Sequence, residues 1–255
     1  MERYFQHSGA IRDLAALPDG RVVSASKDRS IQIWHPDGET APIRLDGHWR
    51  TVTAVDTFDD GRRIVSGSED DTVRIWDLQD RRAGPVTFEG HTDDVLSVLA
   101  LADGRIVSAG EDGTMRFWNP DEGDPALDIL SLGTRIWDLA ELPDGRIVAG
   151  SADGLVRIID PTDLDAEPRI FDGHTNQVLT VTVLADGRVA SGGNDQTVQV
   201  WDPNNLATPA LVFVGHERRV QSLASTADGT VISGSLDGTA SILSLIHISE
   251  PTRPY

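Results

Sequence analysis

The segment GHWRTVTAVDTFDDGRRIVSGSEDDTVRIWD, residues 47–77, carries the pattern from which the rest of the chain can be read. It opens on Gly47 and His48 and closes on Trp76 and Asp77. Between these ends, an Asp-Gly pair separates two short apolar runs, and Asp70 precedes the alternating sequence VRIW. Alternation of apolar and polar residues over short runs is typical of β-strands, so the segment predicts strands joined by turns.

The same series recurs along the whole chain. The opening position is held by six residues at intervals of 41 to 43, namely His7, His48, His91, Leu132, His174 and His216. A second landmark, the aspartate, recurs at intervals of 41 or 42, at Asp28, Asp70, Asp112, Asp153, Asp195 and Asp237. Because two unrelated landmarks keep one register, the chain is a six-fold repeat, and a repeat of this length is one supersecondary unit.

Each repeat predicts four strands. An Asp-Gly pair, which suits the positive φ of tight turns, forms a first hairpin at Asp19-Gly20, Asp60-Gly61, Asp103-Gly104, Asp144-Gly145, Asp186-Gly187 and Asp228-Gly229. The turn at the repeat aspartate forms a second hairpin, and weaker apolar runs at 43–45, 86–88 and 211–213 supply a fourth strand. Helical periodicity is not evident anywhere, so the expected fold class is all-β.

Four-stranded units of this length, with a Gly-His opening and a Trp-Asp ending, resemble the WD-repeat (WD40) β-propeller family. The resemblance covers residues 2–242. It implies one domain over 1–242, a β-propeller of four-stranded antiparallel blades with six repeats visible, truncated at its C-terminus.

Composition narrows the function classes. The net charge is −19, which makes nucleic acid an unlikely partner because such binding requires clustered Lys and Arg. The chain has no cysteine, which excludes disulfides and thiolate metal sites. Residues 1–20 lack a secretory signal pattern and no apolar stretch reaches membrane-spanning length, so we expect no membrane association and a cytoplasmic location.

The last thirteen residues, LSLIHISEPTRPY at 243–255, break the repeat where the sixth Trp-Asp is due. They resemble an in-frame translation of a sequencing adapter, and we interpret them as an adapter or cloning scar rather than native sequence. The sixth repeat is then expected to lack the end of its third strand. Residues Arg3 to Gln6, just before His7, have the pattern of a closing fourth strand, for six blades or for one more.

The resemblance also implies a buried hydrogen-bonded set of His, Ser, Asp and Trp within each blade. Its members are His7, Ser24, Asp28 and Trp34; His48, Ser66, Asp70 and Trp76; His91, Ser108, Asp112 and Trp118; His174, Ser191, Asp195 and Trp201; and His216, Ser233 and Asp237. The fourth repeat replaces three of them together, with Leu132, Ala149 and Ile159. Joint loss indicates a structural unit, because a partly satisfied buried polar network is costly. We therefore predict no catalytic residues, no metal and no cofactor.

The resemblance implies binding at one end of the repeats, on the loops entering the first strand and the turns before the repeat aspartate. Large or charged residues that vary between repeats at these places are Arg12, Lys27, Trp49, Arg50, Glu69, Glu111, Arg135, Trp137, Gln177, Asn194, Arg218 and Arg219. Exposed Trp and Arg dominate interface energetics. For Trp137, packing against the depleted fourth repeat is the competing interpretation.

The leading hypothesis is a non-catalytic scaffold that presents a propeller face to a protein or peptide partner, with no small-molecule substrate. The alternative is the sensor arm of a larger bacterial-type signalling enzyme, a kinase or a nucleotide-binding protein, whose catalytic domain lies outside these residues. A propeller hydrolase with a central calcium ion would need inward carboxylates from several repeats. Asp13 and Asp56 are too isolated in sequence to support it.

Overall fold

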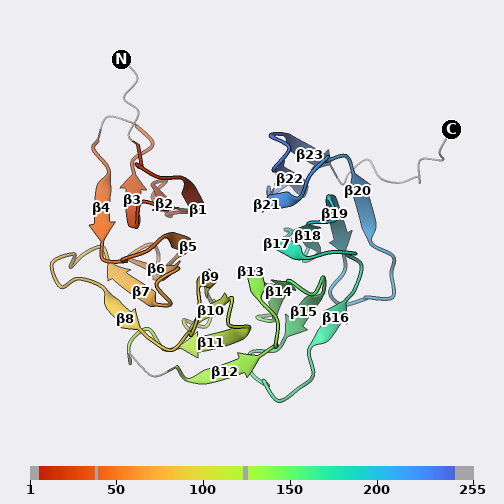
Figure 1. The fold of residues 1–255 in the computed structure, drawn as a ribbon, viewed down its shortest axis with the longest axis horizontal. Coiled ribbons are helices and arrows are strands. Elements are labelled where there is room, and N and C mark those ends of the chain that lie inside the picture. The colour runs from red at the N-terminus through yellow and green to blue at the C-terminus, as the bar shows by residue number, and fades with distance from the viewer. Residues whose placement is uncertain (1–5, 38–39, 123–125, 245–255) are drawn as a thin grey trace. The chain divides into compact units, whose positions relative to one another are not determined.

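The protein is described here from a computed structural model, which covers residues 6–37, 40–122 and 126–244. Every regular element in these residues is a β-strand, and the strands form antiparallel sheets of three or four members, called blades below (Figure 1). The expectation of an all-β fold is therefore confirmed. The chain divides into two compact units, residues 1–136 and 137–255, and each is described by itself.

Unit 1 contains three four-stranded blades, each with its strands in sequence order. Blade 1 is formed by β1 (Ile11–Ala16), β2 (Val22–Ser26), β3 (Ser30–Trp34) and β4 (Ile43–Asp46). Blade 2 is formed by β5 (Val52–Phe58), β6 (Arg63–Ser68), β7 (Val73–Asp77) and β8 (Val86–Phe88). Blade 3 is formed by β9 (Val95–Ala100), β10 (Ile106–Gly110), β11 (Thr114–Trp118) and β12 (Asp128–Ser131).

Unit 2 contains blades 4 to 6, the first strand of blade 4 beginning at Ile136. Blade 4 is formed by β13 (Ile136–Glu141), β14 (Ile147–Ser151), β15 (Val156–Ile159) and β16 (Arg169–Phe171). Blade 5 is formed by β17 (Val178–Val183), β18 (Val189–Gly193), β19 (Thr197–Trp201) and β20 (Leu211–Val214). Blade 6 has three described strands, β21 (Val220–Ser225), β22 (Thr230–Ser235) and β23 (Ala240–Ser244).

In blades 1, 3, 4, 5 and 6, the first turn is built by the Asp-Gly pair and the residue after it. In blade 1, Asp19 Oδ1 accepts the backbone N–H of Arg21 at 3.1 Å, and its Oδ2 accepts the Arg21 Nε–H at 2.8 Å. Gly20 follows the aspartate with φ of 86°, a left-handed conformation that other residues adopt only with strain. The dipeptide therefore fixes the hairpin through both its carboxylate and its glycine.

Side chains of each blade alternate between two faces. We call the face that carries Val55, Ile64 and Trp76 in blade 2 the leading face, and the opposite one, with Val65 and Ile75, the trailing face. The trailing face of one blade packs on the leading face of the next. This is seen for blades 1 and 2, 2 and 3, 4 and 5, and 5 and 6.

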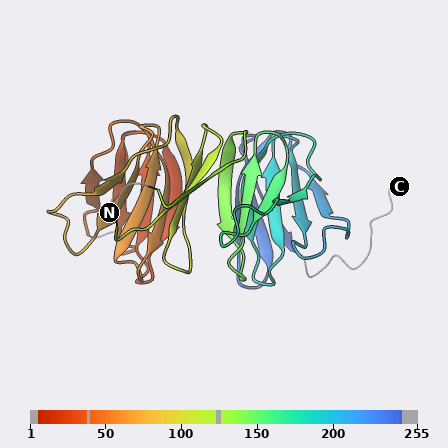
Figure 2. The same cartoon turned by 90° about the horizontal axis from the view of Figure 1, so that it is seen from below.

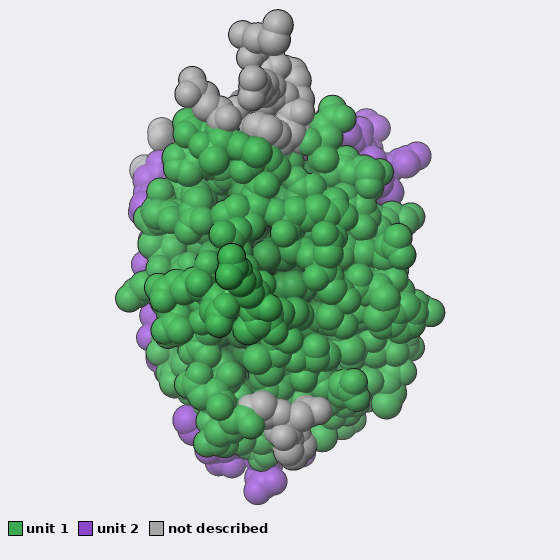
Figure 3. Space-filling model, turned by 90° about the vertical axis from the view of Figure 1, so that its left-hand side faces the viewer, with its two compact units in different colours: residues 1–136 green, residues 137–255 purple. Residues whose placement is uncertain are grey.

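These contacts form the core of each unit. Ile64, Val65 and Trp118 are at most 5% exposed, as are most residues of the packed faces. Figure 2 shows the sheets of each unit side by side with their strands aligned. On the side of unit 1 drawn in Figure 3, side chains form a continuous surface over the sheets. Burying a branched apolar side chain contributes about 1.5–3 kcal/mol, so the interlocking faces are the main source of stability.

The first strand of a blade contains a β-bulge in each of the five blades whose first-strand register is resolved. In blade 1 the pairing shifts between Ile11 and Asp13, which leaves Arg12 as the extra residue. The corresponding extra residues are Thr53, Leu96, Leu179 and Gln221. A bulge re-aims one side chain without breaking the sheet, so one position per blade is released from the core pattern.

Of two expectations about the chain ends, one is contradicted by the structure and the other lies almost entirely outside the described residues. The expectation that the third strand of blade 6 is cut short is wrong. β23 pairs with β22 along its full length, with Leu243 opposite Val231 and Ser244 opposite Thr230, because Leu243 keeps the apolar alternation of the missing tryptophan. The proposed closing strand Arg3 to Gln6 lies outside the described residues except for Gln6, which is not in a strand.

Within the described residues, no helix is long and apolar enough to traverse a lipid bilayer.

Candidate functional site

In blade 2, a histidine, a serine, an aspartate and a tryptophan form one hydrogen-bonded chain. His48 Nδ1 lies 2.8 Å from Asp70 Oδ2, and His48 Nε2 lies 2.8 Å from Ser66 Oγ. Trp76 Nε1–H donates to the same Ser66 oxygen at 2.9 Å, and the Asp70 carboxylate also accepts the N–H of Trp49 at 3.1 Å. The geometry fits a neutral imidazole that donates from Nδ1 and accepts the serine proton at Nε2.

The arrangement repeats in four other blades. The distance from His Nδ1 to Asp Oδ2 is 2.9, 2.9, 2.8 and 3.2 Å for His7–Asp28, His91–Asp112, His174–Asp195 and His216–Asp237. The distance from His Nε2 to Ser Oγ is 2.7, 2.7, 2.7 and 2.8 Å for His7–Ser24, His91–Ser108, His174–Ser191 and His216–Ser233. Trp34, Trp118 and Trp201 donate to the serine of their own blade. Both ring nitrogens of every repeat histidine are therefore engaged inside a blade.

The protonation states agree with this network. Burial lowers the pKa of His48, and the hydrogen bond that His48 donates to the Asp70 carboxylate opposes that effect only in part. Burial also lowers the pKa of His174. Burial by itself raises the pKa of Asp70, but hydrogen bonds from His48 and Thr72 outweigh it and hold the carboxyl well below its usual range. The pair is thus a neutral histidine and a charged aspartate near neutral pH.

Blade 4 replaces the network with an ion pair. Ala149 and Ile159, at the serine and tryptophan positions, are fully buried or nearly so. The remaining aspartate, Asp153, is bound by Arg157, whose Nη2 lies 2.6 Å from Asp153 Oδ2 and whose Nη1 donates to Ser151 Oγ at 2.7 Å. Sequence reasoning did not include Arg157, because an arginine stands four residues after the repeat aspartate also in blades 2 and 3, at Arg74 and Arg116.

The two sets of predicted binding residues meet at one end of each sheet. In blades 1, 2, 3 and 5, the residue before the repeat aspartate donates its backbone N–H to a residue at or just before the first strand. These bonds are Lys27 to Ala10, Glu69 to Thr51, Glu111 to Asp94 and Asn194 to Gln177, at 2.8 to 3.0 Å. We call this end of the blades the loop face. The bonds hold the entering loop and the second turn together as one surface.

The most prominent side chain on the loop face of unit 1 is Trp49, which is 58% exposed. The Arg50 guanidinium carbon lies 4.8 Å from the centre of a Trp49 ring, and Arg50 Nη1 donates to the carbonyl oxygen of Glu69 at 3.2 Å. Arg12 and Lys27 are also exposed. Arg135, by contrast, is held by an ion pair with Glu111 at 2.6 Å.

In unit 2, Arg218 and Arg219 are exposed at the entry to blade 6. Gln177 and Asn194 are half-buried and bond each other, Asn194 Nδ2 donating to Gln177 Oε1 at 3.4 Å. Trp137 is half-buried rather than exposed, and it occupies the repeat position that forms the bulge in the other blades. Packing against blade 4 and contact with a partner both stay predictions for this residue.

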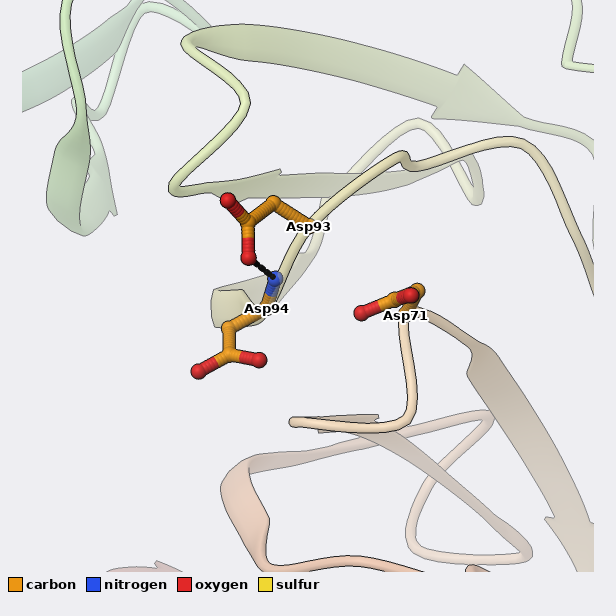
Figure 4. Close-up of side chains that lie close together, drawn as sticks. All are labelled: Asp71, Asp93 and Asp94. Carbon is orange, nitrogen blue, oxygen red and sulfur yellow. Dashed lines mark hydrogen bonds between the residues drawn. The ribbon is translucent and has the colours of Figure 1, made fainter.

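Three carboxylates gather on the loop face of unit 1. The oxygens of Asp71, Asp93 and Asp94 lie within 4.8 Å of one another, and Asp93 accepts the N–H of Asp94 at 3.0 Å (Figure 4). Burial raises the pKa of Asp94, and the nearby carboxylates of Glu69 and Glu111 raise it further. Calcium takes about 6–8 oxygen ligands, more than three side chains of this kind supply, so we assign no metal site here.

Three further aspartates, two of which the sequence analysis considered only as calcium ligands, link neighbouring blades. Asp13 Oδ2 accepts the N–H of Val55 in the next blade at 2.8 Å, and Asp56 Oδ2 accepts the N–H of Ala100 at 2.9 Å. In unit 2, Asp138 Oδ2 accepts the N–H of Val181 at 2.9 Å. Each carboxylate therefore joins the first strands of two successive blades. The residues interpreted as too isolated for a calcium site have this separate role.

A comparison with known protein families gives the identity of the repeats. The profile of the family described as "WD domain, G-beta repeat" matches residues 2–35, 41–77, 85–119, 130–160, 166–202 and 207–243. The chain belongs to the WD40 family. Each WD40 repeat as matched begins before the first strand of its blade; the segment 41–77, for example, contains β4 of blade 1 followed by β5, β6 and β7.

Similar proteins include three WD-repeat proteins of eukaryotes. Coatomer subunit beta'-1 of Arabidopsis thaliana is 39% identical over 77 residues, which is 29% of this chain and 8% of the relative. WD repeat-containing protein 37 of Mus musculus is 32% identical over 115 residues, 44% of this chain and 23% of the relative. Periodic tryptophan protein 2 homolog of Schizosaccharomyces pombe is 34% identical over 113 residues, which is 43% of this chain and 13% of the relative. The matched part of this chain thus spans less than a quarter of each relative.

Proposed function

We propose that this WD40 chain is a non-catalytic interaction scaffold, a β-propeller whose loop face binds a protein or peptide partner. The observation that carries the proposal is the exposed Trp49 with Arg50 stacked on it, because a large aromatic side chain left 58% exposed is the residue type that anchors partners. Arg12 and Lys27 add further exposed side chains at the same end of their blade.

The chemistry of the blades supports binding over catalysis. A general base needs a ring nitrogen within reach of a substrate proton. In His7, His48, His91, His174 and His216, both ring nitrogens are engaged within a blade, with aspartate on one side and serine on the other. The histidine-aspartate pairs, which would otherwise suggest acid-base chemistry, are accounted for as structural units.

The names of the relatives support a role in protein assembly. One is by name a subunit of the coatomer. Within this chain, the loop face varies from repeat to repeat while the faces between blades keep one pattern, and a fold of this kind carries its function on such variable sites. A cytoplasmic location stays a prediction from the sequence.

The test is a comparison of partner capture by matched variants. Trp49→Ala should remove proteins that the tagged full chain captures reproducibly, while the thermal midpoint changes little because the side chain is exposed. The matched control is Val86→Ala, also an exposed apolar residue (49%) but on the outer strand β8. If both variants retain all partners, the loop face around Trp49 is not the binding surface.

The alternative of a sensor arm in a signalling enzyme depends on sequence outside these residues, and it stays a prediction. No contact among the described residues favours it over the scaffold.

A further inference from the structure

A groove opens between blades 2 and 3, at the end of these sheets opposite the loop face. Its volume is about 550 Å³, which lies within the range of roughly 300–1,000 Å³ that ligand-binding clefts occupy. One wall is formed by Ile75 and Val86, on β7 and β8, and the other by Pro120, in the loop that follows β11. All the residues that line the groove belong to unit 1.

The groove exists because blade 3 has a smaller residue at a position that blade 2 fills. In blade 1, the side chain at the position of Val86 is Ile43, and it packs on the core together with Leu78 of blade 2. Leu78 stands two residues after the repeat tryptophan, and in blade 3 that position is Pro120. The shorter proline ring leaves Val86 49% exposed.

The rim of the groove carries more carboxylates than cations. Four carboxylates and two guanidinium groups give it a net charge of −2, from Asp59, Asp77, Asp80, Asp121, Arg62 and Arg63. Both guanidinium groups are already paired, since Arg63 lies 2.8 Å from Asp59 and 2.7 Å from Asp121, and Arg62 lies 2.8 Å from Asp77. In the part of the chain that the structure describes, no arginine or lysine pairs with Asp80. The rim therefore favours a cation over an anion.

An apolar wall beside an acidic rim matches a side chain that has both properties. Lysine and arginine have a long apolar stem that packs on apolar surface and a charged end that stays at the edge. We propose that the groove binds a lysine or arginine side chain of a partner peptide, with the stem against Val86 and Pro120 and the charged end beside Asp80 and Asp121. The net charge of −19 of the whole chain attracts such a peptide from solution.

The test is a titration of the isotope-labelled full chain with the synthetic peptide acetyl-Gly-Ala-Lys-Ala-Gly-amide, followed by amide chemical shifts. The amides of Asp80, Ala83 and Gly84, in the loop between β7 and β8, should shift and saturate. The same peptide with norleucine, which keeps the stem and lacks the charge, should bind at least about threefold more weakly, as expected for loss of a partly exposed ion pair. No saturable shift with the lysine peptide, or equal binding of a norleucine or glutamate peptide, overturns the proposal.

Pro120→Leu tests the position of the site, because it gives blade 3 the residue type that fills the preceding junction. It should cover Val86 and weaken binding of the lysine peptide at least about tenfold, since the stem loses its apolar contact. Asp80→Asn combined with Asp121→Asn should weaken binding at least about threefold. Asp165→Asn is the control for net charge and should have no effect, because it changes an exposed aspartate in the corresponding loop of blade 4.

Two further variants separate the groove from the loop face. Trp49 lies at the other end of blade 2, so Trp49→Ala should leave the titration with the lysine peptide unchanged. Val86→Ala keeps the charged rim and Ile75, so we expect it to weaken binding by less than about threefold. Binding that is lost in Trp49→Ala and retained in Pro120→Leu would place the peptide on the loop face and overturn the proposal.

Discussion

Gln199 Nε2 donates a hydrogen bond of 2.9 Å to the carbonyl oxygen of Gly173, the glycine that precedes the repeat histidine of blade 5. The same side chain and the ring of Phe171 occupy the space where a Cβ on Gly173 would lie. Phe171 cannot withdraw easily because it stacks on Trp201 with ring centres 4.4 Å apart. The glycine of the Gly-His pair is therefore required by the side chain packed above it.

We accordingly expect Gly173→Ala to destabilise the protein by about 1–3 kcal/mol, the usual cost of overpacking. Gly215 holds the same repeat position in blade 6, where a Cβ would meet nothing within 4 Å. Gly215→Ala should therefore be neutral or stabilising by up to about 1 kcal/mol, since it restricts the unfolded chain. Urea unfolding of both variants checks the contrast, and equal effects would contradict it.

A second prediction concerns the histidine network as a unit. His48→Leu alone removes the acceptor of the Ser66 hydroxyl and one donor to Asp70, although both residues keep their other partners, and should cost about 2–5 kcal/mol. Adding Ser66→Ala, Thr72→Leu and Trp76→Ile copies the composition of blade 4. The combined variant should lose less than the sum of the single changes, because Arg74, 4.0 Å from Asp70, can take the role that Arg157 has beside Asp153.

The control for this prediction is Arg74→Gln in the combined background, which should remove the compensation. Chemical denaturation of each variant gives the free energies of unfolding. Additive losses, with no effect of Arg74, would show that the four residues do not act as a unit.

A third prediction follows from the direction of the pKa shifts. His48 and His174 have lowered pKa values in the folded protein, so folding keeps them neutral. Their stabilising contribution is full above the unfolded value of 6.5 and is lost as the pH falls below it. The pKa values of Asp70 and Asp112 are also lowered in the folded protein. Their contribution to stability is lost as the pH falls below 3.8.

The free energy of unfolding should therefore decline from pH 7 toward pH 4 and fall further in stronger acid. Thermal or urea unfolding across this range measures it. His48→Gln should flatten the decline below pH 6.5, because it removes the group whose pKa burial lowers. A stability that rises on acidification to pH 5 would contradict the assignment.

Asp13, the carboxylate that joins blades 1 and 2, leads to a fourth prediction, in which the stability contribution grows rather than declines as the pH falls. Burial raises the pKa of Asp13, although the N–H groups of Val55 and Leu14 oppose it. Asp13→Leu should cost about 1–3 kcal/mol by leaving the Val55 N–H unsatisfied, whereas Asp13→Asn retains an acceptor oxygen and should lose less at pH 7.

Because the pKa of Asp13 is raised, its contribution is full below 3.8 and is reduced as the pH rises. The wild type should therefore gain stability relative to Asp13→Asn as the pH falls from 7 to 4. Unfolding of both proteins at these two pH values is sufficient, and a constant difference would contradict a raised pKa.

Much of the fold could be predicted from the sequence, because a pattern that is weak in one repeat recurs in register in six. A single run such as Val73 to Trp76 is ambiguous, but its return in register fixes strands, turns and the WD40 family together. The fourth strands were predicted at 43–45, 86–88 and 211–213, and they were found as β4, β8 and β20.

The candidate site was harder to predict, since the sequence shows which residues vary between repeats but not which are exposed or what they contact. Trp49 and Trp137 looked alike as tryptophans outside the repeat pattern, yet one is exposed and the other half-buried. Val55, whose N–H Asp13 accepts, is 42 residues away in the next blade, a pairing that only packing reveals. Arg157 replaces a network with an ion pair, which required knowing that its side chain turns back to Asp153.

The bulge in the first strand has a consequence for how such a protein can change. Arg12, Thr53, Leu96, Leu179 and Gln221 share one structural position, and they differ in charge, size and polarity. Of these, Arg12 and Gln221 are exposed, whereas Thr53 bonds the carbonyl oxygen of Val95 in the next blade. A lineage or a protein engineer can therefore alter the surface at Arg12 and Gln221 while the blades stay as they are.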